Sequence, residues 1–200
     1  MKTDAQGQVL FEKGIDIGRW GICSDGERLS ENRFRICGVT QDGEHTQSWV
    51  VDVDSQGDLQ GKFVIDNAPW VSMPTTLRIA RLGSNRTAFV HPVTADGKTY
   101  CYVTVLDDAL KPIAETGVCE VPKFGGEFHV QKYGDGLVIA VKSDPNTISV
   151  YVVDENLRTK AEGIAEPQSA GFLWNFRLAL NETRALILAQ RGIPLKKKTN

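Results

Sequence analysis

The sequence predicts an all-β fold of four similar units, each built from four short antiparallel strands. Three observations lead to this prediction. Runs of β-branched and aromatic residues of strand length recur along the chain, tight turns rich in Asp and Gly separate them, and helical periodicity is almost absent. Strands and turns alone account for nearly all of the 200 residues.

The most regular segment is Thr147 to Arg158 (TISVYVVDENLR), a strand that stops at an Asp and turns. Related segments begin at Ser48 and Tyr100, and Asp4 to Phe11 (DAQGQVLF) matches the end of the pattern. The turn aspartates are Asp4, Asp54, Asp107 and Asp154, at separations of 50, 53 and 47 residues. A repeat of this length is typical of a β-propeller blade. The chain then has room for about four blades.

The first blade is expected at residues 19–66. Its predicted strands are WGIC (20–23), RFRICGV (33–39), SWVVDVD (48–54) and KFVID (62–66). A turn at Ser24, Asp25 and Gly26 is predicted after the first strand, because Asp-Gly supplies the positive φ that tight hairpin connections need. Further Asp-containing turns separate the remaining strands.

The next blades repeat this plan at 77–121 and 127–166, and a fourth begins at 172–200 with FLWNFRLAL and ALILAQR. A helix over Leu180 to Ala189 is the alternative for the second of these strands, but the equivalent segments favour a strand. The outer part of this blade is missing and resembles residues 4–14. We therefore expect the N-terminal strand to pair with the C-terminal half-blade and close the ring as one domain, 1–200.

The segment SDPNTISVYVVDENL resembles the repeat of YVTN-type β-propellers. The recurring Asp-Gly turn followed by an apolar strand is similar to WD-repeat and TolB-like blades. The Gly-His and Trp-Asp dipeptides of WD repeats are absent, and the sialidase Asp-box is approximated only by Thr40, Asp42, Gly43 and Trp49 at different spacing. The resemblance implies a propeller fold and no particular activity.

Charge and hydropathy restrict the partners. The formal net charge is −2 and the pI is about 5.9, so no overall field attracts nucleic acid or an anionic membrane. No apolar run reaches the length of a membrane helix, and the first 30 residues lack the apolar core of a signal peptide. We expect a cytoplasmic protein with no nucleic-acid or membrane partner.

The four cysteines form no CxxC pair, so a zinc site is not expected. Cys23 with Cys37, and Cys101 with Cys119, are predicted to lie on neighbouring antiparallel strands. Reduced, buried thiols are expected in a cytosolic protein, and a cross-strand disulfide is the alternative for an exported one.

No catalytic residue, metal site or cofactor is predicted. The three histidines, His45, His91 and His129, come from different blades, and the sequence lacks a nucleophile motif or a phosphate loop. The turn aspartates share a structural role, accepting backbone N–H groups. Two of Asp16, Asp66 and Glu127 would form a hydrolytic pair if they lay about 5 to 9 Å apart.

The innermost strands carry polar residues that would line the central channel. They are Arg78, Arg81, His129, Gln131, Lys132, Asn175 and Arg177. They are interpreted as polar filling of a narrow channel, and an anion-binding mouth is the alternative.

Aromatic residues recur in the four inter-blade loops, which are expected to open onto one face. Trp and Arg dominate the energetics of many protein interfaces. The predicted binding residues are Arg19, Trp20, Trp70, Phe124, His129, Trp174 and Arg177. The sequence thus favours a non-catalytic scaffold that binds a protein partner through this loop face.

Two alternatives remain open. The first is a propeller hydrolase or lyase that takes a small anionic or sugar substrate at the channel mouth, near Arg78, His129 and Arg177. The second is a segment of a larger propeller that further blades or a second chain complete.

Overall fold

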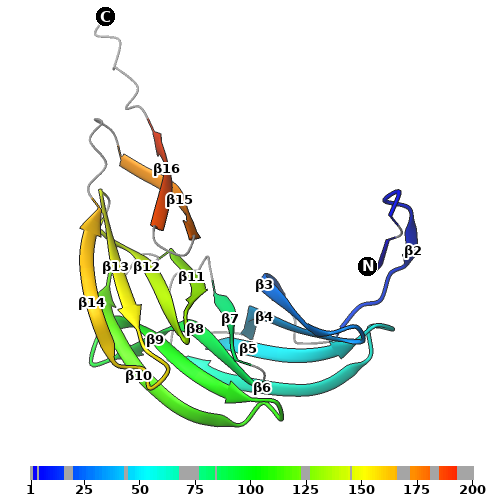
Figure 1. Cartoon of the computed structure of the whole chain (residues 1–200). Helices are drawn as coiled ribbons and strands as arrows, with labels where there is room; N and C mark the ends of the chain where they lie inside the picture. Colours follow the sequence, from blue (N-terminus) through cyan, green and yellow to red (C-terminus); the bar gives the residue numbers. More distant parts are fainter. Residues whose placement is uncertain are drawn as a thin grey trace, which may run out of the picture.

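The structure, a computed structural model, describes residues 2–3, 5–15, 20–42, 45–67, 77–83, 85–122, 127–144, 146–165, 172–180 and 185–192. Every regular element in these ranges is a β-strand, which confirms the all-β prediction. The same ranges contain no helix of the length and apolarity that a membrane crossing requires. The sheets stand side by side in an open arc (Figure 1).

Three sheets have four strands each, and in each sheet consecutive strands are antiparallel neighbours. The first contains β3 (Trp20–Ser30), β4 (Arg33–Asp42), β5 (His45–Asp54) and β6 (Leu59–Asn67). The second contains β7 (Arg78–Leu82), β8 (Arg86–Ala95), β9 (Lys98–Asp107) and β10 (Pro112–Val121). The third contains β11 (Phe128–Tyr133), β12 (Gly136–Asp144), β13 (Thr147–Val153) and β14 (Thr159–Ala165). The first strand of each sheet lies on the concave side of the arc and the last on the convex side (Figure 1).

Two further sheets have only two strands each. One pairs β1 (Lys2–Thr3) with β2 (Val9–Phe11), and the other pairs β15 (Phe172–Leu180) with β16 (Ala185–Gly192). They lie at opposite ends of the arc (Figure 1). The predicted closure of the ring within one chain is therefore not observed among the described residues, because neither β1 nor β2 pairs with β15 or β16.

The turn aspartates have the predicted structural role. The Oδ1 atoms of Asp54, Asp107 and Asp154 each accept backbone N–H bonds of 2.8–2.9 Å from the residues two and four positions later. One residue of each turn, Gly57, Leu110 or Leu157, has a positive φ. The three turns therefore share one geometry, and Asp4 lies outside the described residues.

The turn predicted at Ser24, Asp25 and Gly26 is wrong. β3 runs through these residues to Ser30 and contains a bulge between Cys23 and Asp25. The Asp25 carboxylate accepts a 3.1 Å bond from the backbone N–H of Ile79, in the next sheet. The Asp-Gly pair thus joins two sheets, because a tertiary contact outweighs its local preference for a turn.

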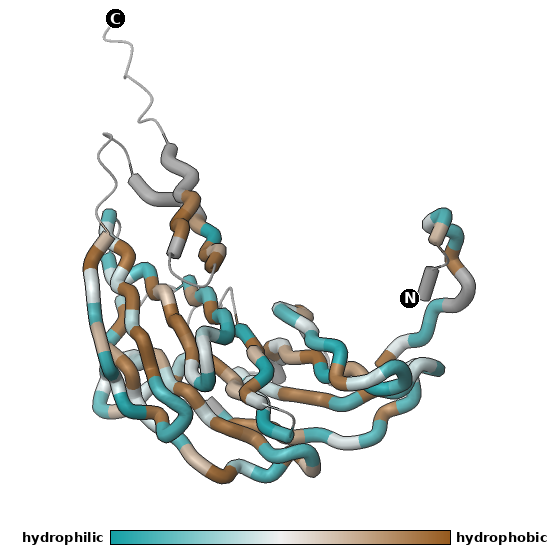
Figure 2. Tube along the Cα trace, viewed as in Figure 1, coloured by the Kyte–Doolittle hydropathy of each residue, from teal (hydrophilic) through white to brown (hydrophobic). Residues whose placement is uncertain are grey.

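Apolar clusters between neighbouring sheets form the core. One joins the first and second sheets around Val50 and Phe89, and another joins the second and third around Val103 and Ile139. A third joins the third sheet to β15 through Phe176 and its neighbours. Apolar residues follow the central strands, and polar residues gather at the turns (Figure 2).

A buried ion pair lies between the first two sheets. The Arg35 guanidinium donates to both oxygens of Asp52, from Nε at 2.7 Å and from Nη2 at 2.9 Å, and neither side chain is more than 2% exposed. Nη1 of Arg35 also donates to Thr87 Oγ1 on β8 (2.9 Å), and both terminal nitrogens reach carbonyls of the Asp107 turn. One side chain on β4 thus fixes the position of the second sheet.

We expect the Asp52→Asn variant to lose about 3–5 kcal/mol of unfolding free energy, because the change leaves the buried Arg35 charge unpaired. The double variant Arg35→Met/Asp52→Leu removes both charges and should lose less than the single variant. Urea unfolding at neutral pH measures both. A loss below about 1 kcal/mol in Asp52→Asn would show that the pair is not buried as described.

Candidate functional site

The structure brings together two of the seven predicted binding residues. Arg19, Trp70 and Phe124, and the side chains of Trp20 and Trp174, lie outside the described residues. His129 on β11 and Arg177 on β15 are in contact. The loop face formed by the aromatic residues stays a prediction.

His129 and Arg177 form a cluster with Glu127. Arg177 Nη1 donates to Glu127 Oε1 (3.4 Å) and lies 3.2 Å from His129 Nε2, which is itself 3.3 Å from the same Glu127 oxygen. The His129 ring meets Phe176 edge-on at a centroid distance of 4.7 Å. Glu127 and His129 are buried, whereas the Arg177 side chain is exposed. Asp66, another carboxylate considered for a hydrolytic pair, instead accepts a bond from Gln47 (2.6 Å), and Asp16 lies outside the described residues.

An ionisable residue occupies the same inner-strand position in each of the three complete sheets and in the β15–β16 sheet. The strand register establishes this equivalence in the complete sheets, and for β15 it follows from aligning Arg177 with Arg78. The pairs are Asp25 with Cys37, Arg78 with Val90, His129 with Ala140, and Arg177 with Leu188. We call Asp25, Arg78, His129 and Arg177 the inner-strand row. This row follows the concave side of the arc, where the central channel of a propeller would lie.

Side chains of the inner strands bind the backbone of neighbouring sheets. Arg78 Nη1 donates to the Ser24 carbonyl (3.1 Å), and Arg81 Nη1 donates to the Leu29 carbonyl (3.2 Å). Gln131 Nε2 likewise donates to the Leu178 carbonyl (2.9 Å). These bonds favour the interpretation of the inner-strand polar residues as polar filling that holds the sheets together.

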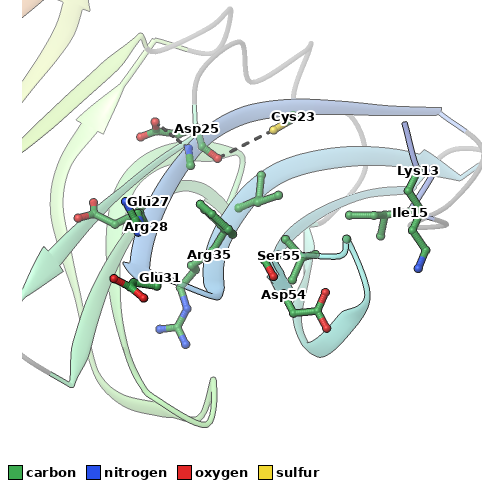
Figure 3. A pocket seen from close by; sticks show the side chains of 15 residues that line it. Lys13, Ile15, Cys23, Asp25, Glu27, Arg28, Glu31, Arg35, Asp54 and Ser55 are labelled. Carbon is green, nitrogen blue, oxygen red and sulfur yellow. Dashed lines mark hydrogen bonds between the residues drawn. The ribbon is translucent and has the colours of Figure 1, made fainter. Parts of the chain in front are cut away.

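A groove of about 610 Å³, which sequence reasoning missed, opens on the first sheet. Its walls come from β3, β4, the end of β5 and the segment after β2, as Figure 3 shows. Phe34, Ile36, Val53 and Ile15 provide the apolar lining. The groove lies on the side of the sheet that faces away from β7–β10.

The groove exists because the first sheet is apolar on both faces. Along β5, Val50 packs towards the second sheet, whereas Trp49, Val51 and Val53 form a cluster on the opposite face. Only the first sheet and Ile15 contribute to that cluster in the described part of the chain. The other three clusters each join two sheets. The groove is thus half of an intersheet core. The apolar residues that β4 and β5 place on both faces of the sheet are the sequence signal that could have revealed it.

Trp49 is the largest buried residue of this cluster and is 2% exposed. Its indole ring lies against Gly38, where an added Cβ would come within 2.2 Å of the ring, so only glycine permits the contact. The buried indole Nε1 has no hydrogen-bond partner among the described residues.

Charged groups of both signs surround the apolar floor. Lys13 forms an ion pair with Asp58, and Arg28 and Glu27 lie on β3 at the rim (Figure 3). Burial and the nearby Asp25 carboxylate raise the pKa of Glu27. A mixed rim of this kind orients a partner more than it attracts one.

The cysteines lie as the sequence predicted, on neighbouring antiparallel strands. Cys101 is directly opposite Cys119 on β9 and β10, and Cys23 and Cys37 lie on β3 and β4. All four thiols are free, but the expectation of buried thiols is wrong for Cys23, which is exposed. A hydrogen bond from Cys101 lowers the pKa of Cys119, and that bond and burial raise the pKa of Cys101. The described residues contain no group of three or more His, Cys, Asp or Glu placed to hold a metal ion.

Comparison with known proteins assigns no family. No protein-family model matches the chain, and no curated protein matches its sequence. The resemblance to propeller repeats therefore concerns pattern alone, and the surfaces described above are the basis for a function.

His91, one of the three candidate histidines, is a core residue. Its Nε2 lies 2.9 Å from Thr104 Oγ1, and its ring stacks on Phe89 at a centroid distance of 4.7 Å. Burial lowers the pKa of His91 to about 4, from an ordinary value of 6.5. The folded protein therefore holds this ring neutral.

Acidification should destabilise the protein partly through His91. The folded pKa lies below the unfolded one, so this contribution is complete above pH 6.5 and is lost as the pH falls towards 4. Between pH 7 and pH 4.5, we expect the unfolding free energy of His91→Gln to fall by about 2 kcal/mol less than that of the wild type. Urea unfolding at both pH values measures this difference. The contribution of the carboxylates is common to both proteins and cancels in the comparison. Equal losses would contradict a buried neutral His91.

Proposed function

We propose that this protein is a non-catalytic interaction scaffold of the β-propeller type, and that the groove on the first sheet is a partner-binding surface. One observation carries the proposal. The open face has the apolar composition of an intersheet core, but no second sheet covers it in the described part of the chain. Phe34 and Ile36 on this face are half-buried, whereas Trp49, Val51 and Val53 are buried. A partly exposed apolar groove on a sheet is a candidate interaction site.

The chemistry of the groove favours a partner that presents a β-sheet. Every other sheet face in the core packs against apolar side chains of a neighbouring sheet. Residues such as Phe34 and Ile36 present the same kind of ridged surface, and sheets pack face to face about 10 Å apart. The predicted loop face around Trp70 and Trp174 would be a second contact region.

A second candidate function is favoured by the Glu127–His129–Arg177 cluster. It places a buried carboxylate and an imidazole beside an exposed guanidinium at the inner edge of the arc. Such a group could bind a small anionic or sugar ligand, as a hydrolase or lyase of this fold would require. Binding of a phosphate or sugar-acid probe that Arg177→Met abolishes, and Lys132→Met retains, would support it. Equal binding by both variants would exclude it.

The protein-binding proposal is tested by filling the groove. Gly26 lines the groove, and a Cβ there would meet only ordinary contacts at 3.7 and 4.0 Å, so Gly26→Phe places a ring in the groove without a clash at Cβ. Gly163 on β14 has nothing within 4 Å and provides the matched control, Gly163→Phe. We expect Gly26→Phe to weaken partner binding about tenfold or more, and Gly163→Phe to leave it unchanged.

The measurement is quantitative co-purification of partners by tagged protein, with a second, differently tagged copy of the chain present. Trp70→Ala/Trp174→Ala reports the loop face separately. If neither Gly26→Phe nor the tryptophan variant changes any association, the scaffold proposal is wrong. Urea unfolding of each variant confirms that it is folded.

A further inference from the structure

The two-stranded sheets at the ends of the arc correspond to different halves of one four-stranded sheet. β1 and β2 match the third and fourth strands. Thr3 pairs with Val9 and Lys2 with Phe11, and fifty residues later Val53 pairs with Leu59 and Asp52 with Gly61, with the same bulge. The turn glycines Gly7 and Gly57 have φ values of +82° and +78°.

β15 and β16 match the first and second strands of a sheet. Arg177 pairs with Leu188 on β16 as Arg78 pairs with Val90 on β8. Ala185 lies three residues before Leu188 on β16, as Thr87 lies three residues before Val90 on β8, so Ala185 corresponds to Thr87. Within the described residues, the C-terminal sheet therefore contains the two strands that the N-terminal sheet does not.

The complete sheets fix how these halves would join. In each of them, one second-strand residue lies opposite the residue before the turn aspartate. The pairs are Phe34 with Val53, Thr87 with Leu106, and Leu137 with Val153. The equivalent residues at the ends of the chain are Ala185 on β16 and Thr3 on β1. Their pairing would complete a sheet in the register of the other three.

The halves cannot meet within the arc as it stands. β2 and β16 lie at its opposite ends (Figure 1), and three intersheet cores hold the sheets in this arrangement. Joining the ends of one chain would require all three cores to repack. A second chain needs no such change, because each copy offers both halves.

A shared sheet would also cover the groove. The segment after β2 lines the groove through Lys13 and Ile15 (Figure 3) and precedes β3 in the chain, so a sheet completed on β1 and β2 would be tethered next to this face. The β15–β16 hairpin presents Leu186 and Leu188, 55% and 59% exposed, whereas Ile187 packs towards the third sheet. The two leucines are thus on the face that would meet the groove.

We propose that the partner of the groove is a second copy of this chain, which pairs its β16 with β1. The pairing is mutual, so two chains form a closed ring in which each contributes three complete sheets and two halves. This inference rests on the proposed function, because it identifies the partner of the same groove.

Cysteine crosslinking tests the register directly. Thr3→Cys carrying one tag is mixed with Ala185→Cys carrying another, and the mixture is oxidised. We expect a covalent species of twice the chain mass that contains both tags, since only an intermolecular bond can join these variants. Wild type controls for the four native cysteines, and Ile164→Cys mixed with Ala185→Cys controls for random collisions of exposed thiols.

The double variant Thr3→Cys/Ala185→Cys distinguishes the alternatives. A disulfide confined to single chains would show that the ring closes within one chain and would overturn the proposal. The absence of a specific bond in both the mixture and the double variant would overturn it as well.

Sedimentation equilibrium of the unmodified chain gives an independent measurement. We expect a dimer that Leu188→Glu and Gly26→Phe each weaken about tenfold or more, because both changes disrupt the apolar contact. Ile164→Glu and Gly163→Phe should leave it intact. A monomer at micromolar concentration, or a series of open oligomers, would contradict the two-chain ring. If other proteins bind the groove in a Gly26-sensitive manner while the chain stays monomeric, the scaffold function stands and only the second-copy partner is wrong.

Discussion

The main constraint on this structure is that its sheets are apolar on both faces. A sheet with one polar face can end a stack, whereas a sheet with two apolar faces requires a neighbour on each side. The second and third sheets have two such neighbours, and six consecutive residues in each of their strands β8 and β12 are buried. In the described part of the chain the first sheet has only one such neighbour, and its other face contains the groove. The interaction surface therefore follows from the repetition of the fold.

Polar contacts set the spacing and tilt that the apolar clusters leave free. Dispersion and burial favour any close packing, but the Arg35–Asp52 pair also reaches Thr87 on the next sheet and therefore accepts only one position of that sheet. The bond from Ile79 to Asp25 acts similarly on the concave side. A buried ion pair is a weak source of net stability but a strong source of specificity when its partners are fixed.

Local features of the fold were predictable from the sequence, and contacts between repeats were not. The turn at Asp154 was predictable because its carboxylate binds the N–H groups of its own turn. Asp25 resembles such a residue in sequence but serves Ile79, in another sheet. The contact of His129 with Arg177 depends on which inner strands become neighbours. The equivalence of the chain ends was visible in the turn spacing, whereas their separation depends on the packing of every sheet between them.

The half-sheets also link folding to association. An isolated two-stranded hairpin is marginally stable in water, and an unpaired strand edge attracts other strands. β16 and β1 each present such an edge within the described residues, and the register of the complete sheets matches these two edges to each other. When the edges of two copies join, the same step completes two sheets, covers Leu186 and Leu188, and fills the groove. The stability of the end sheets would therefore depend on protein concentration, whereas the three central cores, which lie within one chain, would not.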